Sequence, residues 1–399
     1  MTAMTGMTPP KRLRIAVLNR TFAPTGGGAE RYAIALVEQM AARHEIHVFA
    51  QQIDHHWPGV TYHRVSMPLR KPRWVNQLWY ATATWWATRE RKGRGFDVVH
   101  SHENTWHGNV QTVHVLPVWH NLFTHRAGLK LALKWLSVLT SPRLLTYLGL
   151  ESCRFALGRQ ARCIMVTSDG LRQVMADTFP QSASALEVLV PGVALPPTRT
   201  TSIQRADART QLGLPQDLPC ILLVGNDLRK KGLKCLLEAH YLLLKTQHSE
   251  AIVAVVGSTQ QRPVFQAQAE ELGLVGRVFF LGPLNDVTLA YQAADLLAHP
   301  TQEDTFAMVV LEAMAHGLPV VVSGAAYCGI AGLLSDGTNA LLLPDPNDAE
   351  ALATSLQRLL GDAALRDSLG AQARAFAQQH AWAEKAGAQE RVYFRNAKP

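Results

Sequence analysis

The sequence predicts an α/β protein of two doubly wound, parallel-sheet domains that face each other across a cleft. The first observation is a strand, a glycine-rich loop, a helix and a second strand in succession over residues 14–50, which is the βαβ unit of a parallel sheet. The second is a similar series that begins at residue 220. The third is the length of 399 residues, for which two domains are the usual expectation.

The first half contains the strands of a predicted N-terminal domain, residues 1–195. Residues 14–18 form a short apolar run, residues 29–42 have the apolar period of a helix, and residues 45–50 form a second strand. Further strands are expected at 97–100, 109–114, 163–167 and from residue 187. The Pro-rich and polar residues 196–204 that follow are typical of a linker.

The second half predicts a C-terminal domain over residues 205–380. It opens with the apolar strand 220–224, a polar loop and a helix at 233–245. The strands expected further on are 251–256, 278–281, 295–299, 319–322 and 340–343, with helices at 286–294, 349–361 and 363–380. We expect the last segment, 381–399, to pack back on the N-terminal domain. Ligands of doubly wound sheets bind at the carboxyl ends of the strands, and nearly every candidate motif follows a strand.

The composition is that of an ordinary globular protein, with 47% apolar and 18% charged residues. The five cysteines form no CxxC pair and no metal-ligand spacing, so we expect most of them to be buried free thiols in a reducing compartment. The sequence starts without a signal-peptide pattern and contains no run of 18 apolar residues. These features predict a cytoplasmic protein that does not span a membrane.

Positive charge is concentrated in the first half of the chain. Residues 1–180 hold 22 Lys and Arg against 10 Asp and Glu, whereas the remainder holds 17 against 21. Within this half, residues 74–94 and 130–143 interleave tryptophan with cations, which is typical of helices that bind an anionic membrane surface. The same composition suits stacking on single-stranded nucleic acid, or a core helix whose Lys and Arg side chains reach solvent.

The most informative segment is residues 299–322, in which Asp304 and Glu312 flank a change from polar loop to apolar helix. Eight residues along a helix advance about 12 Å, so the two carboxylates cannot bind one small metal ion but can reach two parts of an extended ligand. The helix start between them offers N–H groups and a positive dipole end to a phosphate. A nucleotide sugar fits this layout, with its sugar at one acid, its ribose at the other and its pyrophosphate over the helix.

Two loops after predicted strands are candidate phosphate contacts. Gly27 and Gly28 let the backbone approach a ligand, although a tight βα turn explains them equally well, and the loop lacks the GxGxxG pattern of a dinucleotide cofactor. Arg229, Lys230 and Lys231 precede a helix whose dipole already makes this point positive, a conflict that a bound phosphate would relieve. The alternative is a solvated charge cluster. Lys231 is our preferred phosphate ligand.

Histidines and a further glycine complete the candidate set. His100, His102 and His114 lie at the ends of strands of the first sheet, where a histidine can donate to a sugar hydroxyl or transfer a proton. Among sixteen histidines, any one is more often structural. Their spacing is not that of HExxH, so we infer no metal site. The backbone of Gly282 and Pro283 is a candidate contact for a flat nucleotide base.

On these motifs the chain resembles the retaining glycosyltransferases of family 4, which have the two-domain GT-B fold. Residues 304–322 are similar to the E-x7-E signature of that family, with its trailing helix, Gly317 and the strand after Pro319. Within the family the chain is most similar to the lipopolysaccharide core glucosyltransferases. That closer match lies in residues 224–232, 279–287 and 294–300. The resemblance covers nearly the whole chain.

The resemblance implies roles for the paired acids. Asp304 stands where the first acid of the family contacts the donor sugar, with Glu303 beside it as the alternative, and Glu312 stands where the second acid binds the ribose. The chain departs from the family pattern at three points. Asp304 is one methylene shorter than the usual Glu, residues 305–307 lack the usual glycine, and Asn226 stands where Arg is frequent.

The resemblance also implies the remaining site. Its members are Asp304, His114 and Lys231 as candidate catalytic residues, Arg229 or Lys230 beside Lys231 on the diphosphate, Ala307 and Met308 over the pyrophosphate, and Gly27 and Gly28 lining the cleft. The implied reaction is retaining transfer of a hexose from UDP-glucose or a related UDP-sugar to a lipopolysaccharide core or other cell-envelope glycan, with no cofactor and no metal. The implied setting is peripheral, on the inner face of the cytoplasmic membrane.

Two rival functions remain open at this point. A sugar-nucleotide epimerase of the same fold would use the same donor motifs, but a soluble epimerase needs no basic, tryptophan-rich surface. A non-catalytic protein that binds an anionic polymer through the basic half would need no donor motifs. We therefore expect a nucleotide sugar, a glycolipid acceptor and an anionic membrane surface as partners, and no nucleic acid.

Overall fold

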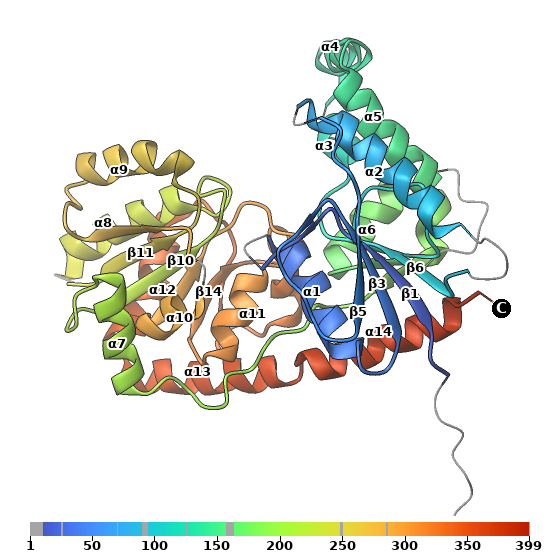
Figure 1. Ribbon diagram of the computed structural model, residues 1–399. Helices are drawn as coiled ribbons and strands as arrows, with labels where there is room; N and C mark the ends of the chain where they lie inside the picture. The colour runs from blue at the N-terminus through green and yellow to red at the C-terminus, as the bar shows by residue number, and fades with distance from the viewer. Residues whose placement is uncertain are drawn as a thin grey trace, which may run out of the picture. The chain divides into compact units, whose positions relative to one another are not determined.

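The computed structural model describes residues 11–24, 27–69, 71–89, 95–124, 126–156, 163–247, 250–284 and 286–398. The chain divides into two compact units (Figure 1). Unit 1 comprises Met1–Val166, Val174–Glu187 and Ala386–Pro399, and unit 2 comprises Thr167–Gln173 and Val188–Lys385. The end of the chain therefore belongs to unit 1.

Unit 1 is built on a seven-stranded sheet in the order β5-β3-β1-β6-β7-β8-β9. Its strands are β1 (Arg14–Leu18), β3 (Glu45–Ala50), β5 (Val60–Arg64), β6 (Val98–Ser101), β7 (Val110–Val113), β8 (Cys163–Val166) and β9 (Leu186–Val188), and β2 (Thr21–Phe22) pairs separately with β4 (Gln52–Ile53). The helices are α1 (Gly28–Met40), α2 (Arg73–Thr88), α3 (Val118–Phe123), α4 (Gly128–Leu139) and α5 (Pro142–Glu151). Two further helices, α6 (Asp169–Thr178) and α14 (Trp382–Asn396), begin in unit 2 and end in unit 1. Strands β6, β7 and β8 are buried along their whole length, as in a parallel sheet covered on both faces.

Unit 2 is built on a six-stranded parallel sheet in the order β12-β11-β10-β13-β14-β15. Its strands are β10 (Cys220–Val224), β11 (Ile252–Val256), β12 (Val278–Gly282), β13 (Leu296–His299), β14 (Val320–Ser323) and β15 (Leu341–Leu343). The helices are α7 (Ser202–Leu212), α8 (Leu233–Gln247), α9 (Arg262–Glu271), α10 (Thr288–Ala293), α11 (Met308–Ala315), α12 (Ala349–Gly361) and α13 (Ala363–Gln378).

Both faces of the unit 2 sheet are covered, so the predicted doubly wound architecture is confirmed for this unit. Alternate residues of a strand point to opposite faces. Leu222 packs in a core with α7, α10, α11 and α13, whereas Leu223 packs in a second core with α8, α9 and α12. No helix among the described residues combines the length and apolar character needed to cross a membrane.

The predicted linker is in part a helix. Helix α7 begins at Ser202, inside the polar segment 196–204. Thr201 and Gln204 form a capping box, in which each side chain accepts a hydrogen bond from the backbone N–H of the other. The polar residues therefore mark a helix start. The expectation that most cysteines are buried free thiols is confirmed, because four of the five are buried and Cys153 is exposed.

The segment from Val188 to the linker belongs to unit 2, and contacts with the end of α13 show why. Val193 forms a parallel bridge with Ala381, and its N–H donates to the carbonyl of His380 at 2.8 Å. A Cβ on Gly192 would lie 2.6 Å from the ring of Trp382, so only glycine lets the two segments approach. Backbone pairing, rather than the proline-rich composition, decides where this segment packs.

The strand order of unit 2 places two loops at one edge of the sheet. Strands β10 and β13 are neighbours, and the chain runs outward from them in opposite directions, through β11 to β12 and through β14 to β15. Such a switch point leaves a crevice at the carboxyl ends of the two central strands. The β10 loop (residues 225–232) and the β13 loop (residues 300–307) follow these ends, and they carry most of the predicted site residues.

We predict that Gly232→Ala destabilises the protein by about 3 kcal/mol or more, because Gly232 has φ +79° and a Cβ there would lie 1.8 Å from the carbonyl oxygen of Pro300. Gly273→Ala is the matched control, since Gly273 has φ +70° but open space around it. We expect that control to cost about 1 kcal/mol. Urea unfolding of both variants measures the difference, and equal losses would contradict the close approach of the two loops.

Candidate functional site

The β10 and β13 loops are joined by backbone hydrogen bonds. The carbonyl of Lys230 accepts from the N–H of Gln302 at 2.8 Å and from the hydroxyl of Thr301 at 3.1 Å. Gly232 lies against Pro300 at the other end of the contact. The cations of one loop and the acids of the other are therefore held side by side by the main chain.

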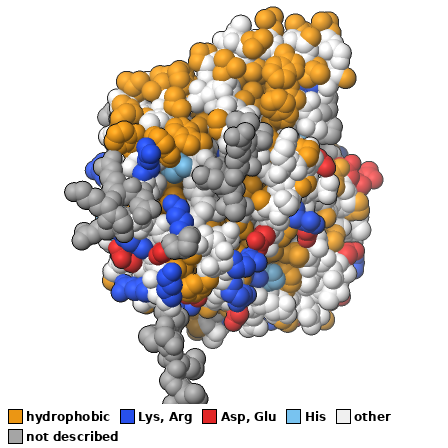
Figure 2. Space-filling view, turned by 90° about the vertical axis from the view of Figure 1, so that its right-hand side faces the viewer, with side chains coloured by type: hydrophobic (Ala, Val, Ile, Leu, Met, Phe, Trp, Pro, Cys, Tyr) orange, Lys and Arg blue, Asp and Glu red, His pale blue; other side chains and the backbone are white. Residues whose placement is uncertain are grey.

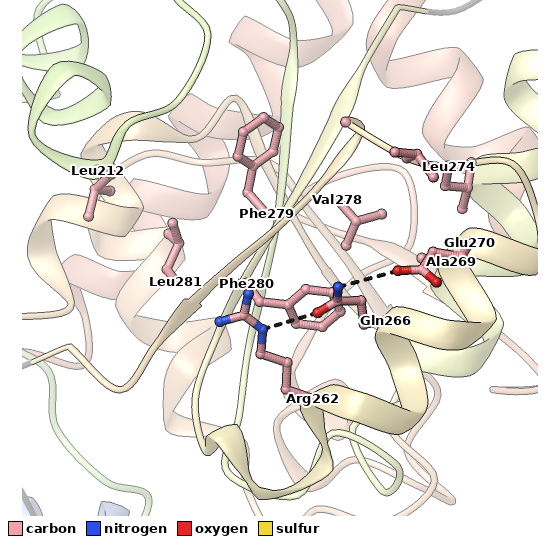
Figure 3. A pocket seen from close by; sticks show the side chains of 12 residues that line it. Leu212, Arg262, Gln266, Ala269, Glu270, Leu274, Val278, Phe279, Phe280 and Leu281 are labelled. Atoms are coloured by element: carbon pink, nitrogen blue, oxygen red, sulfur yellow. Dashed lines mark hydrogen bonds between the residues drawn. The ribbon is translucent and has the colours of Figure 1, made fainter.

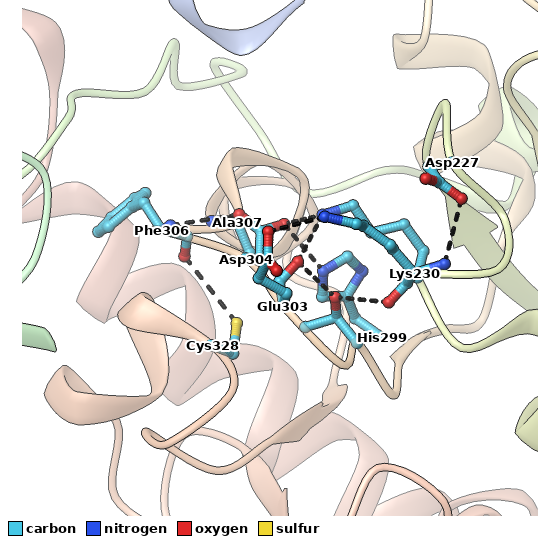
Figure 4. A network of polar contacts seen from close by, with 10 residues as sticks. Asp227, Lys230, His299, Glu303, Asp304, Phe306, Ala307 and Cys328 are labelled. Carbon is cyan, nitrogen blue, oxygen red and sulfur yellow. Dashed lines mark hydrogen bonds and ion pairs between the residues drawn. The ribbon is translucent and has the colours of Figure 1, made fainter. Parts of the chain in front are cut away.

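Asp304 is the centre of this site (Figure 4). Its Oδ2 lies 2.5 Å from Nζ of Lys231 and 3.3 Å from Nε2 of His299. Its Oδ1 accepts the N–H of Phe306 at 3.2 Å and the N–H of Ala307 at 2.7 Å. Only 16% of the side chain is exposed. One carboxylate thus connects the β10 loop, the end of β13 and the start of α11.

The charges of this group are set by its surroundings. Burial alone would raise the pKa of Asp304, but the hydrogen bond from His299 and the positive charge of Lys231 outweigh it, so the pKa lies well below its usual value. Burial lowers the pKa of His299, which leaves its imidazole neutral at pH 7. A neutral imidazole that donates from Nε2 leaves Nδ1 as an acceptor, and this atom has no hydrogen-bond partner within the described ranges.

Sequence analysis did not select His299. It is the last residue of β13, at the edge of the sheet where ligands of this architecture bind, so its position was a usable signal. The apolar run before it predicted a buried strand, and a buried histidine at a strand end is most often structural.

The neighbouring acid is paired in a different way. Glu303 Oε1 lies 2.8 Å from Nζ of Lys230, and 43% and 51% of the two side chains are exposed. Arg229 is also exposed, and its backbone N–H donates to the side chain of Gln261 at 3.2 Å. The structure therefore brings the predicted cations and acids together, with one buried ion pair and one exposed ion pair.

Helix α11 starts from a strained residue. Ala307 has φ +71°, and among the described residues no other non-glycine residue has a positive φ. This conformation costs roughly 1–2 kcal/mol for a residue with a Cβ. Because the N–H of Ala307 already donates to Asp304, the next N–H groups, those of Met308 and Val309, are the ones at the helix start that can meet an anion.

Glu312 lies farther along α11 and has its own partner. The hydroxyl of Tyr291, on α10, donates to Oε2 of Glu312 at 2.7 Å. Tyr291 is another site residue that sequence analysis missed. At the end of β12, Gly282 has φ +73° and its carbonyl accepts the N–H of Gly257 at 3.0 Å, while Pro283 is exposed beside it.

The predicted glycines of unit 1 lie at the start of a helix. Gly27 is the N-cap of α1 and Gly28 is its first residue, after the short strand β2 that follows β1. Thr25 and Gly26, the first residues of the predicted glycine motif, lie outside the described residues. Gly27 and Gly28 are therefore placed where a helix dipole favours an anion.

The three candidate histidines form one cluster in unit 1. Nε2 of His114 lies 3.0 Å from Nδ1 of His102, whose ring lies 4.2 Å from that of His100, centroid to centroid. Nδ1 of His100 lies 2.6 Å from the hydroxyl of Tyr393, on α14. Burial lowers the pKa of His114 to about 4 and holds those of His100 and His102 well below their usual value. All three are therefore neutral at pH 7 and form no cationic site.

A hollow in unit 2 lies away from this site. It measures about 370 Å³ and runs along β12 and α9, lined by Phe279, Phe280 and Arg262 among others (Figure 3). Arg262 donates to Gln266 at 3.4 Å, and Gln266 donates to Glu270 at 3.3 Å. Its polar groups are thus paired along the surface of α9, and its lining includes none of the predicted site residues.

We predict that Asp304→Asn destabilises the protein by about 2–3 kcal/mol, because it leaves the half-buried Lys231 without its counter-charge. Glu303→Gln is the matched control and should cost less than about 1 kcal/mol, since its ion pair is exposed. An unfolded carboxyl of this kind titrates near pH 4 (about 3.9). Since the folded pKa is lower, the stabilisation is present above that pH and is lost as the pH falls further.

Thermal unfolding at pH 7 and at about pH 3 measures both effects for each variant. The difference in stability between the wild type and Asp304→Asn should be largest at neutral pH and smaller in acid, because the folded carboxyl keeps its charge to well below its usual pKa. Equal stability of the wild type and Asp304→Asn at neutral pH would show that the Asp304 contacts do not support the fold.

Comparisons with known proteins match both units. The family model described as Glycosyltransferase Family 4 matches residues 26–195, and the model described as Glycosyl transferases group 1 matches residues 204–376. The lipopolysaccharide glucosyltransferase WaaG of Escherichia coli (strain K12) is 30% identical over 235 residues, which is 58% of this chain and 61% of WaaG. A D-inositol 3-phosphate glycosyltransferase of Xylanimonas cellulosilytica is 35% identical over 218 residues, 52% of this chain and 51% of that protein. The matched stretches thus span between about half and three fifths of these relatives.

Solved structures share the fold over nearly the whole chain. The crystal structure of WaaG has a TM-score of 0.80 at 23% identity and covers 95% of this chain and 99% of its own. Anabaena HepE in complex with UDP-glucose has a TM-score of 0.72 at 18% identity, covering 96% and 100%. These likenesses confirm the GT-B fold class. With a family model on each half and this fold, the chain belongs to the glycosyltransferases of group 1 and family 4.

Proposed function

We propose that the chain transfers a hexose from a nucleotide sugar, with UDP-glucose as the first candidate, to a lipopolysaccharide core or other cell-envelope glycan, with retention of the anomeric configuration. The observation that carries the proposal is the meeting of Lys230 and Lys231 with the start of α11 at the carboxyl edge of the unit 2 sheet. Family membership supports glycosyl transfer. The lipopolysaccharide acceptor of WaaG and the UDP-glucose bound by HepE, as their names state, support the choice of acceptor and donor.

In the proposed reaction a bond forms between the acceptor oxygen and the anomeric carbon, and the bond from that carbon to the phosphate oxygen breaks. The departing diphosphate gains negative charge, which Lys231, its neighbouring cations and the N–H groups at the start of α11 stabilise without a metal ion. The leaving phosphate takes the acceptor proton on the same face, which accounts for retention. Glu312 binds the ribose. The neutral imidazole of His114 forms a hydrogen bond with a hydroxyl of the reacting sugar.

The contacts of the two adjacent acids, Asp304 and Glu303, support different roles for them. Both oxygens of Asp304 are engaged by protein groups, so its part in the proposed site is to hold Lys231 and the start of α11. The side chain of Glu303 forms an exposed ion pair, which a ligand can replace at low cost. Glu303 is therefore the acid that we assign to a hydroxyl of the donor sugar.

We predict that the protein transfers labelled glucose from UDP-glucose to an anionic glycolipid, and that Lys231→Ala lowers the rate by about 100-fold or more, because less charge is stabilised on the leaving diphosphate. Product lipid and released UDP are measured together, with GDP-mannose as a second donor. Isomerised sugar nucleotide without transfer would favour the epimerase. Salt-sensitive polymer binding without turnover would favour the non-catalytic alternative.

We further propose that unit 1 binds an anionic membrane surface through α4. Of the 12 residues of this helix only Val138 is buried. Leu129, Leu133 and Leu136 are 75%, 57% and 59% exposed and follow one another at the spacing of a single helix face. In the view of Figure 2, hydrophobic side chains gather over the upper part of the surface that faces the viewer. Lys130 and the partly exposed Lys134 interleave with the leucines, as in helices that lie in a membrane interface.

The other tryptophan-rich stretch, residues 74–94, contains helix α2, one face of which is buried. Helix α2 buries Tyr80, Ala81 and Thr84, and only part of its surface, including Trp79 and Trp86 at 43% and 56%, is exposed. The cations at residues 91–94, which the sequence analysis placed in the same stretch, lie outside the described residues. The membrane proposal therefore rests on α4.

We predict that the triple variant Leu129→Ser, Leu133→Ser and Leu136→Ser binds anionic phospholipid vesicles at least about tenfold more weakly than the wild type at low salt, because three leucines no longer enter the interface. Ile203→Ser is the matched control, since Ile203 is 73% exposed on unit 2. Co-sedimentation with vesicles measures the binding. The role of α4 would be refuted if the wild type stayed in the supernatant. It would also be refuted if the triple variant sedimented with the vesicles as much as the wild type does.

A further inference from the structure

Tyr291, on helix α10, contacts Glu312 on α11 and His316, the residue that follows α11. Its hydroxyl donates to Oε2 of Glu312 at 2.7 Å, and its ring stacks on His316 with centroids 5.3 Å apart and an interplanar angle of 26°. Glu312 and His316 are four residues apart, so their side chains lie on the same face of α11. Only 3% of Tyr291 is exposed. The phenol is therefore fixed from two sides by the helix that carries Glu312.

His316 carries no positive charge that could compete with Tyr291 for the carboxylate of Glu312. Burial lowers the pKa of His316 to about 4, with the nearby Arg374 acting in the same direction, so this imidazole is neutral at pH 7. Arg374 is itself occupied, because its guanidinium donates to the carbonyl of Ala315 at 2.6 Å and to the carbonyl of Pro196 at 2.6 Å. These bonds fix the end of α11 to the segment before α7.

A carboxylate that binds a ribose must present its oxygens to two adjacent hydroxyl groups at once. A glutamate side chain has three rotatable bonds, and fixing it at the moment of binding costs conformational entropy. A buried phenol that donates to one carboxylate oxygen fixes the orientation beforehand.

We propose that Tyr291 is a positioning residue that orients Glu312 so that the site distinguishes ribose from 2′-deoxyribose. The inference rests on the proposed function, in which Glu312 binds the ribose of the donor. Tyr291 itself does not touch the sugar; it acts through the carboxylate. The preference for a ribonucleoside diphosphate over its deoxy analogue then depends on the contact between α10 and α11 as well as on Glu312 itself.

The test compares the dissociation constants of UDP and 2′-deoxy-UDP by calorimetry on the full chain. We expect the wild type to bind UDP about tenfold or more tightly than 2′-deoxy-UDP, as is typical of a lost hydrogen bond to a charged group. Tyr291→Phe should weaken UDP binding by about five- to tenfold and 2′-deoxy-UDP binding by much less, so that the ratio of the two constants narrows. A role in packing alone would weaken both ligands equally and leave the ratio unchanged, which would overturn the proposal.

Two further variants make the outcome decisive. Tyr80→Phe removes a buried hydroxyl from unit 1, where it donates to the carbonyl of Phe49 at 2.7 Å, and should leave both constants unchanged. Glu312→Gln should narrow the same ratio without altering Tyr291, and adding Tyr291→Phe to it should narrow the ratio no further. The proposal would be overturned if the two substitutions narrowed the ratio of the two dissociation constants additively. It would also be overturned if Glu312→Gln alone left that ratio unchanged. If the wild type binds neither ligand, the proposed function fails and the inference with it.

Discussion

The ion pair between Lys231 and Asp304 is the interaction on which the unit 2 site depends. It joins the two loops that follow the neighbouring strands β10 and β13, and the same carboxylate caps the N–H groups at the start of α11. Lys231 precedes helix α8, whose dipole opposes a cation at that end. The half-buried carboxylate offsets this repulsion, because an unpaired charge at this depth would be costly. The loops are consequently arranged around a cation before any anion binds.

The shorter side chain at position 304 follows from the same geometry. An aspartate reaches the backbone N–H groups two and three residues ahead, as it does at many turns and helix starts. Here those groups belong to Phe306 and Ala307, and the second bond holds Ala307 at φ +71°. Glycine would adopt that conformation without strain. The bonds made by Asp304 offset the strain of Ala307, so two departures from the usual family pattern, the missing methylene and the missing glycine, are parts of one local arrangement.

The sequence was sufficient for most strands of the two sheets and for the loops that carry the candidate site, because apolar runs and the loops after them are local signals. The edge strand β5 was not predicted, because its residues are exposed or only partly buried and form no apolar run. It was not sufficient for contacts between elements. Tyr291 reaches Glu312 across 21 residues, and His299 reaches Asp304 from the end of a strand that predicted only burial. The prediction of a linker over residues 196–204 was wrong in part for a similar reason, since a polar run is compatible with both a linker and a capping box. Residues 188–195 join unit 2 by backbone pairing, which composition does not encode.

The exposure of each acid decides which contacts a ligand can exchange. Asp304 is 16% exposed and makes four contacts, so replacing its partners would leave Lys231 and two N–H groups to be satisfied together. Glu303 is 43% exposed, and breaking its pair with Lys230 costs at most about 1 kcal/mol. In the proposed reaction an incoming diphosphate would therefore gain Lys230 at small cost, and the released Glu303 would become an acceptor for the hydroxyls of the attached sugar. In the proposed reaction the buried ion pair keeps the two loops in place, whereas the exposed ion pair can be replaced by contacts with the ligand. Two adjacent acids can therefore serve both purposes, which one acid could not.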